Sequence, residues 1–146
     1  DIPQDVLQNI FEAGRQSPSA INKQPIRFIA VTDKELKKFF SDVLFNRFIK
    51  DSPVVLVGCA DVEALLTGKW AVIDTCIALE NMVIAAWSLG VGSCWIGAFN
   101  EEKVKGSLKV PDNWKIVALV TFGYPAEQPK PKKKKQIEEL FSFNSF

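Results

Sequence analysis

Histidine is absent from this chain of 146 residues. It is the side chain that most often exchanges protons near neutral pH, and it serves as the base in Ser-His and Cys-His nucleophilic systems. Its absence therefore excludes both of those catalytic arrangements. If the protein is an enzyme, we expect a bound cofactor to carry the difficult chemistry, with no side chain acting as the catalytic group.

Cysteine is scarce, and the common nucleotide-phosphate loops are missing. Cys59, Cys76 and Cys94 lie in apolar surroundings without C-x-x-C spacing. Three dispersed cysteines without histidine do not suit zinc, so we expect no metal and reduced, buried thiols in a cytoplasmic protein. Neither G-x-G-x-x-G nor G-x-x-x-x-G-K-S/T occurs in the sequence.

Basic residues are few outside one short segment. Five of the 18 lie between Lys130 and Lys135, and the rest of the chain has 13 basic against 17 acidic residues. A nucleic-acid-binding surface needs a basic face on the fold itself, so this distribution indicates no nucleic-acid partner. With 47% hydrophobic and 24% charged residues, the composition is that of one soluble globular domain.

Hydrophobic periodicity and turn residues predict alternating helices and strands. Helices are expected over residues 3–15, 32–44, 70–90 and 101–108, and strands over residues 27–32, 54–60, 91–99 and 115–123. Thr32 and Asn100 are the expected caps of the second and fourth helices. The strands are too apolar to have an exposed face, which indicates a sheet between layers of helices, with strand order and direction left open.

The predicted helix over residues 70–90 is long enough to span a bilayer. However, Asp74, Glu80 and Asn81 interrupt it, and a charge at bilayer depth is costly. We therefore expect no membrane span. A helix that is apolar nearly all round is typical of a protein core or a subunit interface.

Three stretches remain that could carry chemistry: RQSPSAINKQPIRFIAVTD (residues 15–33), IDTCIALENMVIAAWSLGVGSCWIGAF (residues 73–99) and GYPAEQPKPKKKKQIEEL (residues 123–140). In this order they resemble the FMN-dependent nitroreductase family. The resemblance implies an α+β, three-layer fold with a mixed central sheet and helices on both sides. It further implies one flavin-binding domain over residues 1–146, with 124–146 as an extended arm.

The first stretch is similar to a family loop that lies along the flavin, often the flavin bound mainly by the other subunit. Carried over, Ser19 and Asn22 would hydrogen-bond the ribityl-phosphate or the ring edge, with Ala20 beside them. Pro18 and Pro25 would fix the shape of the loop before the ligand binds. The alternative is that these polar residues only cap and turn the chain.

The second stretch contains WIGAF, which resembles the strand whose backbone lines the flavin ring. Carried over, the amide of Gly97 would face N5, the flavin atom that accepts hydride, with Trp95, Ile96 and Ala98 beside it. Glycine and alanine suit such a close approach of backbone to a ligand. The alternative is an apolar strand that ends in a turn.

Charged residues complete the site that the resemblance implies. Lys132 and Lys134 would bind the FMN phosphate, which needs cations, although lysine gives a looser match than arginine. Arg47 would lie near the pyrimidine edge of the flavin, and Asp74 matches a polar position near it. A solvated basic tail and a surface arginine are the alternatives, whereas a buried Asp74 needs some partner.

The resemblance implies a homodimeric FMN-dependent oxidoreductase with FMN at the interface. NADH or NADPH would reduce the flavin, and a nitroaromatic, quinone or related small molecule would reoxidise it in a ping-pong reaction. The alternatives are a relative with other reductive chemistry, a degenerate flavin-binding module and a cofactor-free scaffold. The family usually has an Arg-rich phosphate-binding segment upstream of the first helix, where this sequence begins, so we expect that segment to be absent from this sequence or FMN affinity to be reduced.

Overall fold

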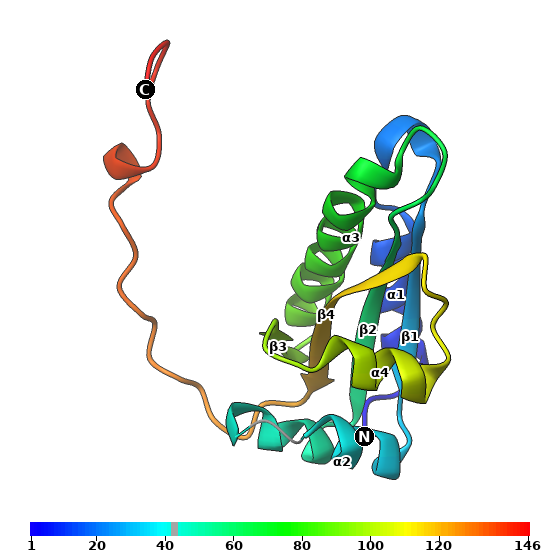
Figure 1. Cartoon of the computed structure of the whole chain (residues 1–146). Helices are drawn as coiled ribbons and strands as arrows, with labels where there is room; N and C mark the ends of the chain where they lie inside the picture. Colours follow the sequence, from blue (N-terminus) through cyan, green and yellow to red (C-terminus); the bar gives the residue numbers. More distant parts are fainter. Residues whose placement is uncertain (42–43) are drawn as a thin grey trace.

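Helices cover both faces of a four-stranded sheet in the computed structural model, which describes residues 1–41 and 44–146 (Figure 1). The elements are, in chain order, α1 (Gln4–Arg15), the 3-10 helix η1 (Ala20–Asn22), β1 (Ile26–Val31), α2 (Lys34–Phe40), the 3-10 helix η2 (Leu44–Asp51), β2 (Val54–Asp61), α3 (Gly68–Ser88), β3 (Gly92–Ile96), α4 (Glu101–Leu108), β4 (Trp114–Gly123) and the 3-10 helix η3 (Ile137–Glu139). The predicted α+β, three-layer fold is confirmed.

The sheet has the strand order β1-β2-β4-β3, so β1 and β3 form its two edges. All three pairings within the described residues are antiparallel, and in this respect the sheet differs from the expected mixed sheet. The reason lies in the connections. The last residue of β1, Val31, lies opposite Val55 at the start of β2, so β2 runs back along β1. In the same way, β3 runs toward the end of the sheet where β4 begins, so these two strands also run in opposite directions.

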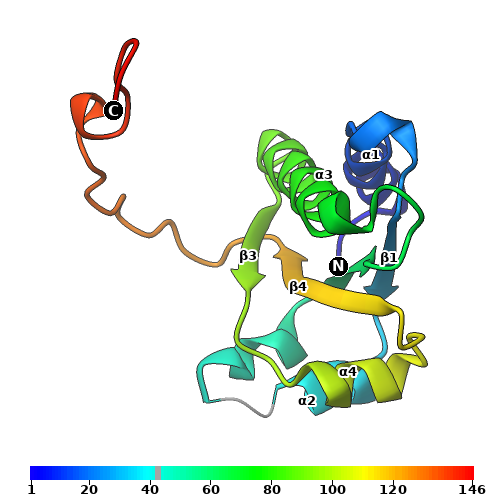
Figure 2. The same cartoon turned by 45° about the horizontal axis from the view of Figure 1, so that its top comes forward.

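Strand β2 is buried on both faces because its side chains alternate between two hydrophobic clusters. Val54 and Leu56 pack with α1 and α3, whereas Val55, Val57 and Cys59 pack with α2, η2 and α4. Figure 2 shows the resulting layers, with α1 and α3 on one side of the sheet and α2 and α4 on the other. This double burial explains why the sequence of β2 is continuously apolar.

Helix α3 has two apolar stripes. The stripe that faces the sheet and α1 is buried: it includes Ala71, Ala78, Leu79, Met82 and Ala86. The second stripe is exposed: Trp70, Ile73, Ile77, Ile84 and Trp87. Among the described residues, α3 is the one helix whose length and apolar composition would allow it to cross a membrane. Here it packs against β2, β4 and α1.

The helix ends follow short-range signals in the sequence. Gly90 has φ +75° just beyond α3, and the Val91 amide donates to the Ala86 carbonyl at 2.9 Å, as at a left-handed helix end. The prediction that Asn100 caps α4 is confirmed, since its side chain accepts from the Lys103 amide at 2.9 Å. The prediction for α2 was wrong by one residue, because Asp33, rather than Thr32, accepts a helix amide.

Residues 124–146 leave the end of β4 and extend away from the rest of the chain (Figure 1). Apart from the short η3, this arm has no helix or strand. Large apolar side chains near its end are exposed: Ile137, Leu140, Phe141, Phe143 and Phe146. Exposed apolar side chains grouped in this way are typical of a surface that meets a partner.

Gly68 at the start of α3 gives a stability prediction. A β-carbon there would collide with the carbonyl oxygen of Val62, whereas one at Gly106 in α4 would meet no atom within 4 Å. We expect Gly68→Ala to lower the free energy of unfolding by about 1–3 kcal/mol. The control Gly106→Ala should raise it by about 0.5–1 kcal/mol, since glycine is unfavourable inside a helix. Urea unfolding of both variants checks this, and equal stabilities would contradict the close packing described at Gly68.

Candidate functional site

The loop between α1 and β1 has an unusual backbone. Ile21, Asn22 and Gln24 have φ values of +45°, +56° and +54°. Left-handed backbone is unfavourable for residues other than glycine, and for a β-branched residue such as Ile21 it is rare. Strain of this kind persists only where the surroundings fix it, and it is concentrated at functional sites.

Hydrogen bonds from within the loop and from α3 hold this conformation. The Ser19 hydroxyl accepts from the Gln24 amide at 2.9 Å, and the Gln24 side chain donates to the Asn22 carbonyl and side chain. Both carboxylate oxygens of Asp74 accept from the Ala20 amide, at 3.1 and 3.2 Å. Asp74 is only 5% exposed, so this amide is the partner that its burial required.

Ser17, just after α1, uses its hydroxyl within the protein. It is buried, its hydroxyl donates to the Ala13 carbonyl at 3.1 Å, and it accepts from the Asn81 side chain on α3 at 2.8 Å. These bonds tie the end of α1 to α3. Pro18 and Asn22 remain exposed and Ser19 and Ala20 half-buried, so the part of the loop that a ligand can reach begins after Ser17.

The predicted flavin-facing strand lies on the other flank of α3. Ile96 ends β3 and is buried, whereas Gly97 and Ala98 are exposed. The Trp95 indole donates to the Glu80 carboxylate on α3 at 3.1 Å, which fixes the ring beside the strand end. A β-carbon at Gly97 would meet nothing within 4 Å, so the backbone there borders open space.

Asn46 connects this strand end to η2. Its side-chain nitrogen donates to the Ala98 carbonyl, and the asparagine is only 5% exposed. The next residue, Arg47, is exposed. Through its neighbour Asn46, the backbone of Arg47 therefore lies near the corner where β3 ends.

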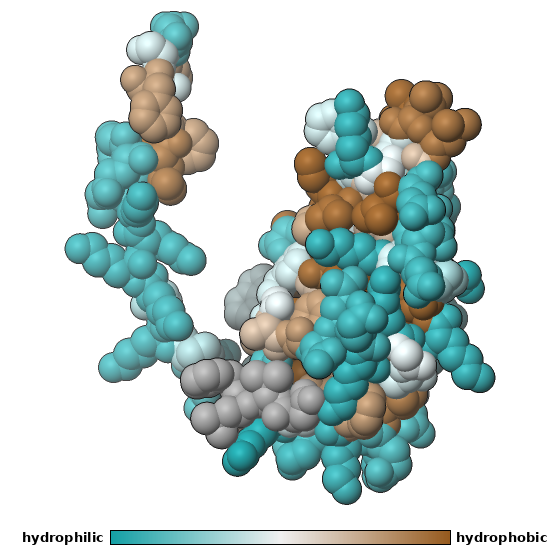
Figure 3. Space-filling view, viewed as in Figure 1, coloured by the Kyte–Doolittle hydropathy of each residue, from teal (hydrophilic) through white to brown (hydrophobic). Residues whose placement is uncertain are grey.

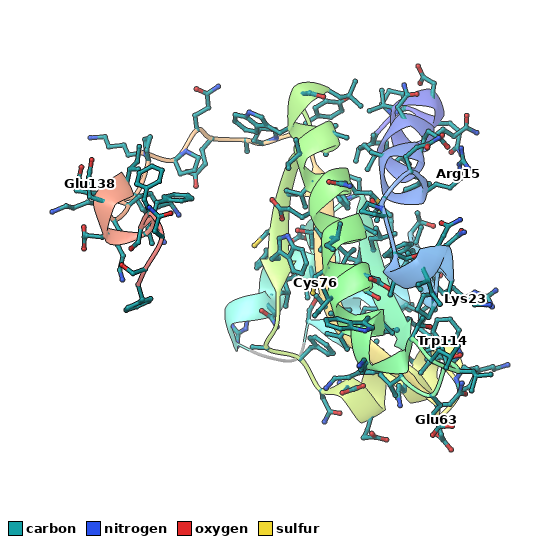
Figure 4. The ribbon with its side chains drawn as sticks, turned by 90° about the horizontal axis from the view of Figure 1, so that it is seen from above. Arg15, Lys23, Glu63, Cys76, Trp114 and Glu138 are labelled. Carbon is teal, nitrogen blue, oxygen red and sulfur yellow. The ribbon has the colours of Figure 1, made fainter. Side chains whose placement is uncertain are left out.

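The two lysines predicted to bind phosphate are exposed on the arm, apart from both flanks of α3. Lys132 and Lys134 lie between β4 and η3, and Figure 4 shows Glu138, farther along the arm, well separated from Cys76 on α3. The same figure places Lys23, on the loop, on the side of α3 away from the arm. Within one copy of the chain, the predicted site residues thus fall into three groups: those on or beside the loop, those at the end of β3, and the lysines of the arm.

The distance between the first two groups is set by the sheet. The loop leads into β1 and Gly97 follows β3, and these are the opposite edges of the four strands. Three strand spacings separate them, about 14 Å in all. Helix α3 lies between the loop and β3 (Figure 2).

Two cavities of about 420 Å³ border the loop side of the molecule, and neither includes Trp95 or Gly97 in its lining.

The three cysteines differ in environment. Cys59 is buried in β2, where desolvation raises the pKa of its thiol to about 11. Burial also raises the pKa of Cys76, which is half-buried on α3. The prediction of three buried thiols therefore holds in full only for Cys59, and it was wrong for Cys94, which is exposed because β3 is an edge strand.

Comparison with known proteins decides the family. The sequence profile described as Nitroreductase family matches residues 1–57 and 37–124, which is most of the chain. The chain belongs to the nitroreductase family. The predicted family is therefore confirmed, and with it the expectation of an enzyme of the oxidoreductase class.

Individual relatives agree with this membership of the nitroreductase family. The chain is 32% identical over 135 residues to a Methanothermobacter thermautotrophicus protein named "Putative NADH dehydrogenase/NAD(P)H nitroreductase", covering 88% of this chain and 70% of the relative. It is 31% identical to the FMN reductase (NAD(P)H) of Bacillus subtilis, covering 90% of this chain and 61% of that protein. The solved FMN-dependent nitroreductase of Clostridium difficile R20291 has a TM-score of 0.86 at 26% identity, covering all of this chain and 90% of the other.

Sequence reasoning missed three side chains of this nitroreductase-family chain that organise the candidate site. Asn46, Glu80 and Gln24 each hydrogen-bond a residue that was predicted to contact flavin. The signal for Asn46 was a lone amide in the mostly apolar run LFNRFI, but only the adjacent Arg47 was assigned a role from the sequence. Nothing in the sequence indicated that Asn46 would meet Ala98 or that Glu80 would meet Trp95, because these two bonds depend on the tertiary fold, whereas Gln24 meets Asn22 only two residues away.

Asp74 gives a prediction that separates support of the loop from contact with a ligand. We expect Asp74→Ala to lower the free energy of unfolding without any ligand by about 1.5–3 kcal/mol, because it leaves the Ala20 amide unpaired. Amides of residues 19–24 should also exchange with deuterium faster. The exposed Asp112→Ala is the control. Unchanged stability and exchange in Asp74→Ala would mean that the carboxylate does not hold the loop.

Proposed function

We propose that the protein is an FMN-dependent NAD(P)H oxidoreductase that acts as a homodimer on small acceptors such as nitroaromatics or quinones. The names of the Bacillus subtilis and Clostridium difficile relatives support FMN as the cofactor and NADH or NADPH as the donor. The observation that carries the proposal is the open space beside Gly97 at the end of β3. A planar cofactor can lie against backbone only where no side chain intervenes.

When bound, FMN would accept hydride from NADH or NADPH and pass two electrons to the acceptor in a ping-pong sequence. The residues of this chain would bind and orient it. The Gly97 amide would face N5, and Trp95, held by Glu80, would bound the ring on one side. Ile96 would contribute backbone only, because its side chain is buried in the core. No side chain is needed as an acid or base, which agrees with the absence of histidine.

The strained loop would supply fixed donors to a second part of the cofactor. Asn22 is exposed, and Ser19 keeps a hydroxyl hydrogen while its oxygen accepts from Gln24. Asp74 would act from behind the loop, by holding the Ala20 amide, rather than by contacting the flavin. Because the loop is ordered before the ligand arrives, little conformational entropy is lost on binding.

Basic side chains would neutralise the negative charge of the cofactor. Lys132 and Lys134 on the arm would pair with the dianionic phosphate. Arg47, exposed beside Asn46, would place a positive charge near the pyrimidine edge, where it would stabilise an anionic reduced flavin. The lysines would reach a phosphate near α3 most simply if the arm crosses to a second copy.

A homodimer accounts for the exposed apolar surface. The outer stripe of α3 and the end of the arm both expose large apolar side chains, among them Trp87 at 73% and Phe143 at 92%. Figure 3 shows hydrophobic surface near the top of the body, over the start of α3 and the loops beside it. Pairing two copies along α3 would bring the loop flank of one copy toward the strand flank of the other.

The three free cysteines fit a cytoplasmic, reducing environment.

The visible spectrum of the purified protein, after incubation with FMN and gel filtration, tests the function. We expect two flavin bands that bleach when NADH or NADPH is added without oxygen and return when a nitroaromatic or quinone is added. Removal of FMN should abolish the oxidation of NAD(P)H. Bands that do not bleach with either nucleotide, or activity that survives loss of FMN, would contradict the proposal.

A further inference from the structure

Asn46 is a buried polar side chain that reaches from η2 to the backbone of the segment between β3 and α4. It lies in η2 on the face of the sheet opposite α3, and its partner is the carbonyl of Ala98, 52 residues away. A carbonyl can only accept, so the nitrogen of the asparagine amide must face Ala98. At 5% exposure, this amide has little access to water as an alternative partner.

The bond falls in the middle of a short exposed segment. On one side, Ile96 is fixed by its pairing with Leu119 and by burial. On the other side, Asn100 is fixed as the cap of α4. Between these anchors, Gly97 has the widest choice of backbone angles of any residue type, and a β-carbon built there would meet no atom within 4 Å. The bond from Asn46 therefore restrains the part of the chain that its own residues leave free.

We propose that Asn46 is a positioning residue that aims the Gly97 amide at N5 of the flavin. This inference rests on the proposed function, in which that amide faces N5. Asn46 acts through the Ala98 carbonyl, so its effect is to fix the direction of a donor before the cofactor binds. A donor fixed in advance needs no reorganisation during hydride transfer.

The inference predicts a change in the properties of the bound flavin. N5 of oxidised FMN accepts a hydrogen bond, whereas N5 of reduced FMN carries a hydrogen and cannot accept one in the same way. A misaimed Gly97 amide therefore weakens binding of the oxidised form more than that of the reduced form. The midpoint potential rises as a result, while reduction by NADH slows because N5 is less well oriented.

The test uses two variants that lose the bond by different routes, with the full chain loaded with FMN. Asn46→Leu keeps the size of the side chain without a donor, and Asn46→Ser is polar but too short to reach Ala98. The control Ile49→Val shortens a fully buried side chain of the same segment and is expected to lower stability by about 0.5–1.5 kcal/mol while keeping the hydrogen bond from Asn46 to Ala98.

Both Asn46 variants should raise the midpoint potential by about 30 mV, equivalent to a tenfold change in the relative affinity for the two redox forms. Their ¹⁵N5 signal in labelled FMN should move, and reduction by NADH should slow about tenfold. Ile49→Val should match the wild type in all three. Asn46 variants that bind FMN with unchanged potential and N5 signal would overturn the inference and leave the proposed function intact. A wild-type protein that binds no FMN would overturn both.

Discussion

Helix α3 has more apolar surface than one chain can cover, and the arrangement of the rest of the molecule follows from this. Its inner stripe is buried against the sheet and α1, which fixes the core on that face. Its outer stripe, from Trp70 to Trp87, stays exposed in a single copy. An exposed apolar stripe of this kind is typical of a surface that meets a partner. In the proposed homodimer, a second copy would be that partner.

The polar residues of α3 connect this packing to the candidate site. Asp74 and Asn81 hold the loop on one flank, and Glu80 holds Trp95 on the other. The same residues break the hydrophobicity of the helix and make a membrane span costly. One helix thus carries an inner face for the core, an exposed apolar outer face and polar contacts that hold both parts of the candidate site.

Local features of the sequence were enough to predict most of the elements. The continuous apolar run of β2, the amide of Asn100 and the glycine after α3 each encode a short-range preference, and the structure agrees with each. Long-range pairings were beyond the sequence. The contact of Asn46 with Ala98 and that of Asp74 with Ala20 join residues 52 and 54 positions apart, and the strand order also pairs segments that are distant in the sequence, so no local pattern predicts any of them.

The most direct test of the shared site uses dimers made from two different variants. One variant carries Ser19→Ala and Asn22→Ala in the loop, and the other carries Gly97→Val, which fills the open space at the strand end. If each site takes its loop from one copy and its strand from the other, the mixed dimer keeps one intact site and binds about one FMN per two chains, while neither variant alone binds FMN. A purified mixed dimer that binds no FMN would contradict the account, because it would place both parts of the site in one copy.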